Sequence, residues 1–406
     1  MSEWKKVKLG ELYEVHNGLS KGRQFFGTGF PFLTFSNVFN NWFLPEQLES
    51  LVQTTDKERE ACSIKAGDVF ITRTSETMDE LGMSSVALKD YPNATYNGFT
   101  KRLRPITDRV NPRYIGYYLR TPKFRGQFMA FSSMTTRASL ANNDLLNMEV
   151  ELPPMETQHH IATILSRYDS LIENYQKQIK LLEEAAQRLY KEWFVDLRFP
   201  GHENTKIVDG VPEGWEKKPA LDFFEMSIGK TPPRTQKQWF TKGSNGIPWV
   251  SISDMKDTMF VQETAEELTQ DACENYNIKV VPKETILLSF KLTVGRVAFA
   301  GADVCTNEAI AHFQKEGDDW KAYTLMYLRN YNYDSLGNTS GISKAVNSTI
   351  IKNMPFVMPC TAILQEFSQR VLPFIKQTEN LQSQLRLLTE ARDRLLPKLM
   401  SGEITV

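Results

Sequence analysis

The chain has 406 residues, of which 41% are hydrophobic and 24% charged, and its formal net charge is -1. This length favours two or three domains, and the composition is that of a soluble protein with ordinary hydrophobic cores. The near-zero charge excludes a basic field over the whole molecule, so any site for a polyanion must be a local cluster.

Export, membrane insertion and metal binding are not indicated by the sequence. The first residues lack an apolar signal segment, and no apolar run approaches the ~18 residues of a membrane-spanning helix. The cysteines are scattered, without a CxxC pair or a histidine at metal-ligand spacing: Cys62, Cys273, Cys305 and Cys360. We therefore predict reduced thiols and a cytoplasmic protein without a membrane partner.

The two halves of the chain repeat one another. GFPFLTFSNV (Gly29 to Val38) aligns without a gap with GIPWVSISDM (Gly246 to Met255), at an offset of 217 residues. Further matches are Trp4 with Trp215 at an offset of 211, GDVFITRT (67–74) with KETILLSF (283–290) at 216, TYNGF (95–99) with CTNEA (305–309) at 210, Tyr118-Leu119-Arg120 with Tyr327-Leu328-Arg329 at 209, and NMEVELP (147–153) with NMPFVMP (353–359) at 206. Such drift is typical of a duplication whose surface loops gain or lose residues, so we predict two copies of roughly 200 residues.

A helical region closes each copy. Apolar residues step by four and three from Ile161 to Trp193, which is the spacing of a coiled-coil seam, and the seam recurs from Phe367 to Leu399. Thr378 and Arg392 are polar interruptions of the second seam. The positions predicted to pair are Ile161, Leu165, Ile172, Ile179, Leu182, Leu189, Trp193, Phe367, Val371, Leu381, Leu385, Leu388, Leu395 and Leu399.

Two further expectations concern these helices. Pro373 should kink or restart the second helix, because proline has no N–H to donate and clashes with the preceding turn. Glu183, one step off the first seam, should be largely solvated.

The predicted fold class is α+β, a tandem pseudo-twofold repeat of two mixed α/β domains joined by two long antiparallel coiled-coil helices. The alternative is a helix packed inside a single globular domain. The predicted divisions are residues 1–152 for the first domain, 153–198 for the central helix, 199–358 for the second domain with a linker at 199–212, and 359–406 for the C-terminal helix. This arrangement would be a dumbbell, with one β-rich domain at each end.

No catalytic constellation is evident. FFGTG (Phe25 to Gly29) fits the FxGxG pattern of amino-methyltransferases, but it follows a polar segment, and the accompanying (Asn/Asp)-Pro-Pro-(Tyr/Phe) tetrapeptide is missing. Gly229-Lys230-Thr231 looks like the end of a P-loop, but Phe224 occupies the place of its first glycine. His159 and His160 have no ligand partner at a suitable spacing. The chain is therefore predicted to recognise or to scaffold, without a cofactor of its own.

Local basic segments are the candidates for polyanion contact. Residues 101–137 carry nine Lys or Arg against one acid, Asp108, with aromatic residues between them. The alternative is a solvated helix face in front of core aromatics. Two loops, Asn17 to Gly29 and Met226 to Gly243, occupy matched positions before the opening strand of each copy and differ in sequence. Related frameworks with different loops predict two readers of different targets.

The chain resembles the specificity subunits of type I restriction-modification systems. LPPMETQHHIATILSRYDSLIE (Leu152 to Glu173) is similar to the family's entry into its conserved helix, and RDRLLPKLMSGEI (Arg392 to Ile404) looks like its C-terminal signature. Trp215 in VPEGWE looks like the start of the family's second reader. One departure is an extra residue before Gln365, compared with the spacing that precedes Gln158.

The resemblance implies a non-catalytic subunit that reads a split sequence of double-stranded DNA in the major groove through two target-recognition domains. It implies that the helices act as a spacer and as the docking surface for two modification (methyltransferase) subunits, in a complex with restriction (helicase-nuclease) subunits. Adenine N6 methylation and ATP-dependent cleavage would belong to those partners, together with AdoMet, ATP and Mg. The competing interpretation is a coiled-coil scaffold whose end domains bind protein.

Base readout typically uses Arg or Lys for guanine and Asn or Gln for adenine. By position, the candidate DNA contacts of the first reader are Lys21, Arg23, Gln24, Arg73, Lys101, Arg102 and Arg137. Those of the second reader are Lys230, Arg234, Gln236, Lys291 and Lys344.

Overall fold

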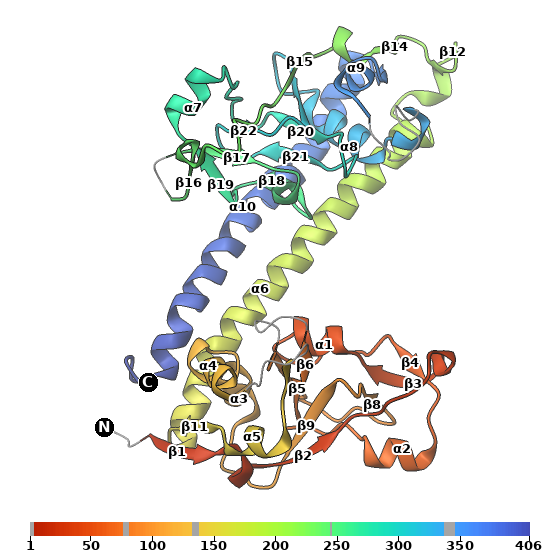
Figure 1. The fold of residues 1–406 in the computed structure, drawn as a ribbon. Helices are drawn as coiled ribbons and strands as arrows, with labels where there is room; N and C mark the ends of the chain where they lie inside the picture. The colour runs from red at the N-terminus through yellow and green to blue at the C-terminus, as the bar shows by residue number, and fades with distance from the viewer. Residues whose placement is uncertain (1–3, 76–80, 132–137, 244–245, 337–345) are drawn as a thin grey trace. The chain divides into compact units, whose positions relative to one another are not determined.

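The computed structural model describes residues 4–75, 81–131, 138–243, 246–336 and 346–406. The chain divides into two compact units, which are Met1–Ile172 with Leu388–Val406, and Glu173–Leu387. Each unit contains one β-rich domain and a part of each long helix (Figure 1). No described helix is long and apolar enough to cross a membrane.

The domain of the first unit is built from short strands and helices in alternation. Its strands are β1 Lys5–Lys8, β2 Tyr13–Asn17, β3 Phe26–Leu33, β4 Leu51–Val52, β5 Val69–Thr72, β6 Thr74–Ser75, β7 Ser84–Val86, β8 Thr95–Tyr96, β9 Thr100–Pro105, β10 Ala138–Ser139 and β11 Glu149–Leu152. Its helices are α1 Phe35–Asn40, α2 Asp56–Ala61, α3 Pro112–Tyr118, α4 Pro122–Phe131 and α5 Asn142–Asn147. The main sheet has the strand order β2-β9-β5-β7, and a second sheet has the order β4-β3-β8.

The domain of the second unit follows the same plan. Its strands are β12 Ile207–Val208, β13 Val211–Pro212, β14 Glu216–Pro219, β15 Glu225–Ile228, β16 Phe240–Thr241, β17 Ile247–Val250, β18 Phe260–Val261, β19 Glu266–Leu268, β20 Ile286–Ser289, β21 Val297–Ala300, β22 Cys305–Thr306, β23 Ile310–Gln314 and β24 Pro355–Met358. Its helices are α7 Gln270–Asn275, α8 Lys321–Asn330 and α9 Ser348–Lys352. The main sheet has the order β15-β23-β20-β21-β18, and a second sheet has the order β16-β19-β17-β22.

The repeat holds at the level of strand register. In the first unit β3 runs parallel to β8 with Phe32 opposite Thr95, and in the second β17 runs parallel to β22 with Trp249 opposite Cys305. These pairs lie at the offsets predicted from the sequence. The antiparallel pairs β2–β9 and β15–β23 also match residue for residue. The duplication is therefore a duplication of the fold.

One stretch of the predicted alignment is wrong by one residue. Val69 of β5 lies opposite Leu103, and Ile286 of β20 lies opposite Phe313. Because Leu103 and Phe313 are equivalent, Val69 corresponds to Ile286, which makes the offset 217 and not 216. Every residue of both strands is buried. Without alternation between apolar and polar residues, the pattern could not define the register.

The first and last strands of each domain pair with each other. Strand β1 pairs with β11, with Lys5 opposite Leu152, and β14 pairs with β24, with Glu216 opposite Met358. The long helices start a few residues after these closures: α6 spans Met155–Tyr190 and α10 spans Thr361–Met400. Closing the domain therefore determines where its helix starts.

Gln158 fixes the entry of α6. Its buried side chain accepts a hydrogen bond from the backbone N–H of Asn111 at 2.9 Å, and donates to the carbonyls of Arg109 and Pro153 at 3.0 Å each. In the second copy Gln365 is exposed, and the buried Leu364 lies at the matching offset of 206. Because of the extra residue before Gln365, an apolar side chain occupies the position in α10 at which Gln158 makes these hydrogen bonds in α6.

Helix α10 is continuous over 40 residues and runs through Pro373, so the expectation that Pro373 restarts the helix is wrong. Pro373 and Gln369, the residue four positions earlier, are both exposed. The carbonyl of Gln369, which loses its helical donor, thus belongs to a residue on the exposed side of the helix.

The two helices pair within each unit, and none of the predicted seam residues is exposed. In the first unit, Ile161 and Leu165 of α6 share a core with Leu399 of α10. In the second, Trp193, just after α6, shares a core with Phe367 of α10. The start of α6 thus packs with the end of α10, and the end of α6 with the start of α10, so the pair is antiparallel.

Of the two polar interruptions, Arg392 ties the helix pair to the first domain. Its Nη1 lies 2.9 Å from Oδ1 of Asp169 on α6, and its guanidinium lies over the ring of Trp42. The other carboxylate oxygen of Asp169 accepts a hydrogen bond from the hydroxyl of Tyr117 on α3. Thr378, by contrast, is buried, and its Oγ1 has no hydrogen-bond partner among the described residues.

Glu183 does not behave as expected. It is half-buried, and its Oε1 lies 3.5 Å from Nη1 of Arg329, whose guanidinium also donates to the carbonyls of Thr258 and Val297. The expectation that Glu183 is solvated is therefore wrong, because the neighbouring domain supplies a partner that the heptad pattern alone does not show.

The seam predicts different effects of one substitution at two adjacent leucines of α6. Leu182 is half-buried on the seam, whereas Leu181 is 64% exposed. We expect Leu182→Asp to lower the free energy of unfolding by on the order of 2 kcal/mol because it places a charge against the partner helix, and Leu181→Asp to cost far less. Urea unfolding followed by circular dichroism measures both. Equal losses would contradict the pairing.

Candidate nucleic-acid interface

In both units a glycine of the predicted loop, Gly18 or Gly229, packs against a turn that begins at an asparagine, Asn97 or Asn307. These two segments are the glycine loop and the asparagine turn of each unit. A Cβ added to Gly18 would lie 2.2 Å from the carbonyl oxygen of Asn97, and one added to Gly229 would lie 2.2 Å from the carbonyl oxygen of Asn307. No side chain fits at these distances. The Oδ1 of Asn97 accepts from the N–H of Phe99, at 2.7 Å, and the Oδ1 of Asn307 accepts from the next-but-one N–H at 3.0 Å. In each copy, the loop and the turn form one surface.

Arg234 is the best-positioned cation of the second surface. Its Nη1 lies 2.6 Å from Oε2 of Glu266, and its guanidinium lies 4.4 Å from the ring centroid of Phe240 and 4.5 Å from that of Trp249. The side chain remains 51% exposed. An arginine held by a carboxylate and two rings loses little freedom when it binds a further partner.

The segment that carries Lys291 and the turn that contains Glu308 belong to the same surface. Thr231 donates a hydrogen bond to the carboxylate of Glu308. Burial would raise the pKa of Glu308, but the hydrogen bond from Thr231 and the nearby charges of Lys291 and Arg234 lower its pKa overall. Lys291, the turn at Glu308 and the loop from Thr231 to Arg234 therefore lie together.

Two more predicted residues belong to the same loop. Lys230 is exposed, and its backbone N–H donates to the carbonyl of Thr306 at 3.0 Å. The Oε1 of Gln236 accepts from the indole N–H of Trp239 at 2.6 Å and from the hydroxyl of Tyr276 at 2.8 Å, which orients the amide.

His312 supports this surface from below. It is fully buried, with Nδ1 2.8 Å from Oγ of Ser227 and Nε2 2.7 Å from Oγ1 of Thr306. Burial lowers the pKa of His312 to about 4, so the ring is neutral at physiological pH. Ser227 and Thr306 lie on the strands that lead into the loop and the asparagine turn, and the neutral ring links them.

In the first unit the predicted loop residues Arg23 and Gln24 lie on an exposed 3-10 turn, and Lys21 lies just before it. Lys21 Nζ lies 2.7 Å from Oε1 of Glu58 and 4.9 Å from the ring centroid of Phe25, and the hydrogen bond from Lys21 is the main cause that lowers the pKa of Glu58 to about 2. Arg23 and Gln24 are exposed on the same turn. Lys21 is thus already paired, while Arg23 and Gln24 face solvent.

Exposed aromatic side chains on this surface were missed from the sequence. Phe99 is 55% exposed and Phe26 is 40% exposed. The backbone N–H of Arg73 donates to the backbone carbonyl of Phe99 at 3.0 Å. The predicted cation Arg73 and the exposed ring of Phe99 therefore belong to backbone segments that lie side by side. The Asn-Gly dipeptide just before Phe99 was the available signal, because it marks a turn that presents the next residue.

Lys101 and Arg102 lie inside the first domain and not on its candidate interface loops. Their exposed fractions are 4% and 2%. Lys101 donates to the side chain of Asn142, and Nη1 of Arg102 donates to the carbonyl of Ser63 at 2.6 Å. We therefore remove both from the candidate contacts.

The wider basic segment 101–137 is largely structural. Arg104 pairs with the buried carboxylate of Asp68 at 2.7 Å, and Arg120 donates to backbone carbonyls, including that of Ser84 at 2.6 Å. The aromatics between them are core residues: Tyr114, Tyr117, Tyr118, Phe124 and Phe128. A segment whose arginines hydrogen-bond to backbone carbonyls has the same amino-acid composition as a phosphate-binding patch. The sequence alone therefore could not distinguish these structural arginines from DNA contacts. Arg137 and Lys344 lie outside the described residues.

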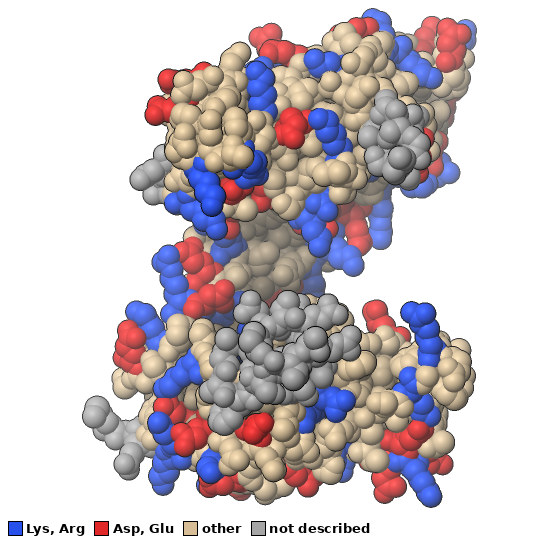
Figure 2. Space-filling model, viewed as in Figure 1, with Lys and Arg blue, Asp and Glu red and all other residues tan. Residues whose placement is uncertain are grey.

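Charge is distributed rather than concentrated. On the face seen in Figure 2, Lys and Arg side chains lie among Asp and Glu side chains on each unit. Among the residues that the structure describes, no group of three or more His, Cys, Asp or Glu could hold a metal ion. The candidate interface therefore depends on a few positioned side chains and not on a broad basic field.

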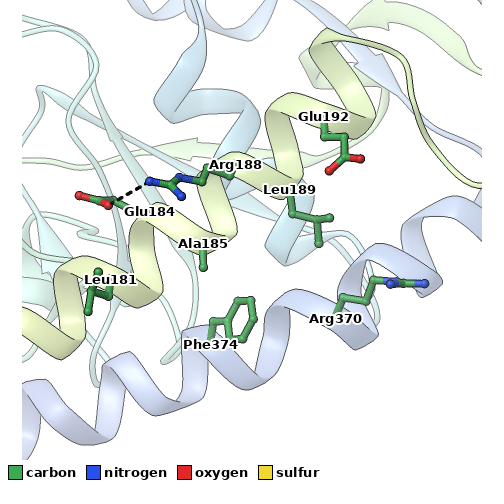
Figure 3. A pocket seen from close by; sticks show the side chains of 8 residues that line it. All are labelled: Leu181, Glu184, Ala185, Arg188, Leu189, Glu192, Arg370 and Phe374. Carbon is green, nitrogen blue, oxygen red and sulfur yellow. Dashed lines mark ion pairs between the residues drawn. The ribbon is translucent and has the colours of Figure 1, made fainter.

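The helix pair of the second unit offers a separate surface, a shallow groove shown in Figure 3. Its apolar floor comes from both helices: Leu181, Ala185, Leu189 and Phe374. Charged side chains border it: Glu184, Arg188, Glu192 and Arg370. The ion pair between Arg188 and Glu184, at 3.7 Å, lies along one edge.

Comparison with known proteins identifies the architecture. The model of the type I restriction modification DNA specificity domain matches residues 1–184 and again residues 212–389. The whole chain aligns with the type I restriction enzyme MjaIX specificity subunit of Methanocaldococcus jannaschii, at 27% identity over 94% of that protein. It also aligns with the type I restriction enzyme HindI specificity subunit of Haemophilus influenzae, at 24% identity over all of that protein. The fold is similar to the crystal structure of the type I restriction-modification system S subunit from M. genitalium, with a TM-score of 0.63, 13% identity, and coverage of 98% of this chain and 96% of the other.

His312 predicts a pH dependence of stability. The pKa of His312 is about 4 in the folded chain, below the ordinary value of 6.5. Between these two pH values the imidazole is mostly protonated in the unfolded chain and mostly neutral in the folded chain. The stabilisation is complete above pH 6.5 and is lost as the pH falls toward 4. Between pH 7 and pH 5 the loss should be about 2 kcal/mol.

Urea unfolding at a series of pH values measures this loss, and the window above pH 5 avoids most carboxylate titration. His312→Gln should flatten the dependence, whereas His160→Gln, at an exposed histidine of α6, should not. An unchanged slope in His312→Gln would assign the pH dependence to other groups.

Proposed function

We propose, from the premise that the chain belongs to the type I restriction modification DNA specificity domain family, that it is the subunit that reads a split DNA target in the major groove. Each unit would read one half of the target through its glycine loop and asparagine turn. The readers of the two halves would differ because their loops differ.

One observation carries this proposal. The two units share strand registers and the close approach of Gly18 and Gly229 to an asparagine turn, yet the side chains presented there differ. The first surface offers Arg23, Gln24 and exposed rings, and the second offers Arg234 held by Glu266. A constant framework with variable polar side chains is suited to reading two different base sequences.

The helices would serve as spacer and as docking surface. The groove in Figure 3 combines an apolar floor with a charged border, which is the composition that a helix of another subunit can bury. We infer that two modification subunits dock on the helices and that restriction subunits join the complex. Adenine N6 methylation and ATP-dependent cleavage, with AdoMet, ATP and Mg, would then be the work of these partners. The interpretation as a protein-binding scaffold is not favoured by the comparisons.

Selection of duplexes from a random pool tests the reader. The full-length chain, alone and with a methyltransferase subunit of its own system, should enrich two short fixed blocks separated by unspecified bases. Arg234→Ala should relax one position of one block, at a cost of about 1–3 kcal/mol in binding, and leave the other block intact. Arg198→Ala, at an exposed arginine of the same unit that lies between the helical region and the linker, is the matched control.

Binding should also weaken as salt is raised, since phosphate contacts release counterions. If the wild-type chain and complex enrich no sequence, the proposal fails. If Arg234→Ala alters both blocks equally, the assignment of one block to each unit fails.

The spacer is tested by lengthening it. Contacts to the second domain occupy α10 as far as Arg386, whose Nη1 lies 3.3 Å from Oε1 of Glu263, and contacts to the first domain include Arg392. A heptad inserted after Leu387 of α10 and another after Glu173 of α6 should preserve the seam and both sets of contacts.

Each added heptad is ~10 Å of helix, which corresponds to about three base pairs. We expect both blocks to survive selection while the unspecified gap grows, or binding to fail. If the gap stays constant while the blocks change, the helices do not set the spacing.

A further inference from the structure

Leu292 has an unusual position in the second unit. Its side chain is 92% exposed, and its backbone is left-handed, with φ of 61°. It lies in the turn between β20 and β21, directly after Lys291 and before Thr293. An exposed leucine alone is ordinary, but a branched apolar side chain in the left-handed region costs conformational energy that glycine or asparagine would avoid.

The turn that carries Leu292 is firmly held. The buried hydroxyl of Ser289 donates to the carbonyl of Thr293 at 2.6 Å and accepts from the N–H of Arg296 at 3.0 Å. The carbonyl of Ser289 accepts from the N–H of Gly295 at 2.9 Å. Nη1 of Arg296 is in turn anchored on the carbonyl of Ile252 at 2.7 Å. The strained residue is therefore imposed by its surroundings, which is the pattern found at functional sites.

The turn also borders the candidate interface. The N–H of Phe290 donates to the carbonyl of Ala309 at 2.9 Å, which joins the base of the turn to the asparagine turn of this unit. The charge of Lys291 acts on Glu308, which accepts a hydrogen bond from Thr231 in the glycine loop. Leu292 is thus presented beside the side chains that we propose to face DNA. The matching segment of the first unit spans residues 73–83, of which 76–80 lie outside the described residues.

We propose that Leu292 is a specificity contact, which reads the C5-methyl group of a thymine in the half-site of the second unit. This rests on the proposed function. The thymine methyl is the apolar group that base pairs present in the major groove, and an exposed leucine on a firmly hydrogen-bonded turn, between a lysine and a threonine, matches it. The lysine can contact phosphate while the leucine packs on the methyl group. Burial of both apolar groups from water stabilises this contact.

The experiment removes the methyl group from the DNA and the leucine from the protein, singly and together. Each thymine of the selected second half-site, on either strand, is replaced in turn by deoxyuridine, which lacks only that methyl. Kd is measured for the full-length wild type, for Leu292→Ala, and for Leu221→Ala, which trims an exposed leucine of the same unit on the 3-10 turn Ala220–Asp222. Thermal unfolding of each variant confirms that the fold is retained.

We expect wild type to bind one deoxyuridine duplex about fourfold more weakly than the parent, as for one buried methyl group. Leu292→Ala should bind the parent duplex about fourfold more weakly and should be insensitive to deoxyuridine at that position. Leu221→Ala should behave as wild type.

Three results would overturn the inference. Leu292→Ala could keep wild-type affinity and wild-type sensitivity to deoxyuridine, it could weaken target and scrambled duplexes by the same factor, or the second half-site could contain no A·T pair. Each leaves the proposed function standing, provided that wild type still discriminates the target from a scrambled duplex. Loss of that discrimination in wild type would instead refute the proposed function.

Discussion

The antiparallel pairing of the first and last strand in each domain is the constraint on which the rest of the molecule depends. With Lys5 opposite Leu152 and Glu216 opposite Met358, each domain is closed before its long helix begins. The helix therefore leaves from a fixed point beside the domain's own start. The pairing of the helices follows from two such starting points in one chain, and so would the spacing and docking that we propose for them.

Much of this framework could be predicted from the sequence, because its signals are long or repeated. The 4,3 spacing of apolar residues from Ile161 to Trp193 is typical of a long coiled-coil helix, and the recurrence of the same spacing from Phe367 indicates the duplication. The prediction failed where local information was silent. The fully buried strands β5 and β20 carry no alternation, so their alignment slipped by one residue. Pro373 lies within a continuous helix, and both Pro373 and Gln369, whose carbonyl it leaves without a helical donor, are exposed residues.

The candidate site was harder to predict, because residue type does not reveal the direction of a side chain. Lys101 and Arg102 are consecutive residues of β9, so their side chains leave opposite faces of the strand, and only the structure shows that both are buried. Arg234 looked like one basic residue among several, yet a carboxylate and two rings hold it in place. His312 carried no motif at all. Its role depends on Ser227, which is 85 residues away in sequence and was not recognisable as a partner.

The cores of the two units have a consequence for the ancestry of the chain. The core of the first unit includes Leu396 and Leu399 from the second copy's helix, and the core of the second includes Ala186 and Trp193 from the first copy's helical region. Each half thus completes the other, as in a domain-swapped dimer whose two protomers have been fused. A half-length ancestor would have satisfied the same contacts by associating with a second copy of itself. In a fused chain, unlike in such a homodimer, the two recognition surfaces need not be identical, so one can change while the other is kept.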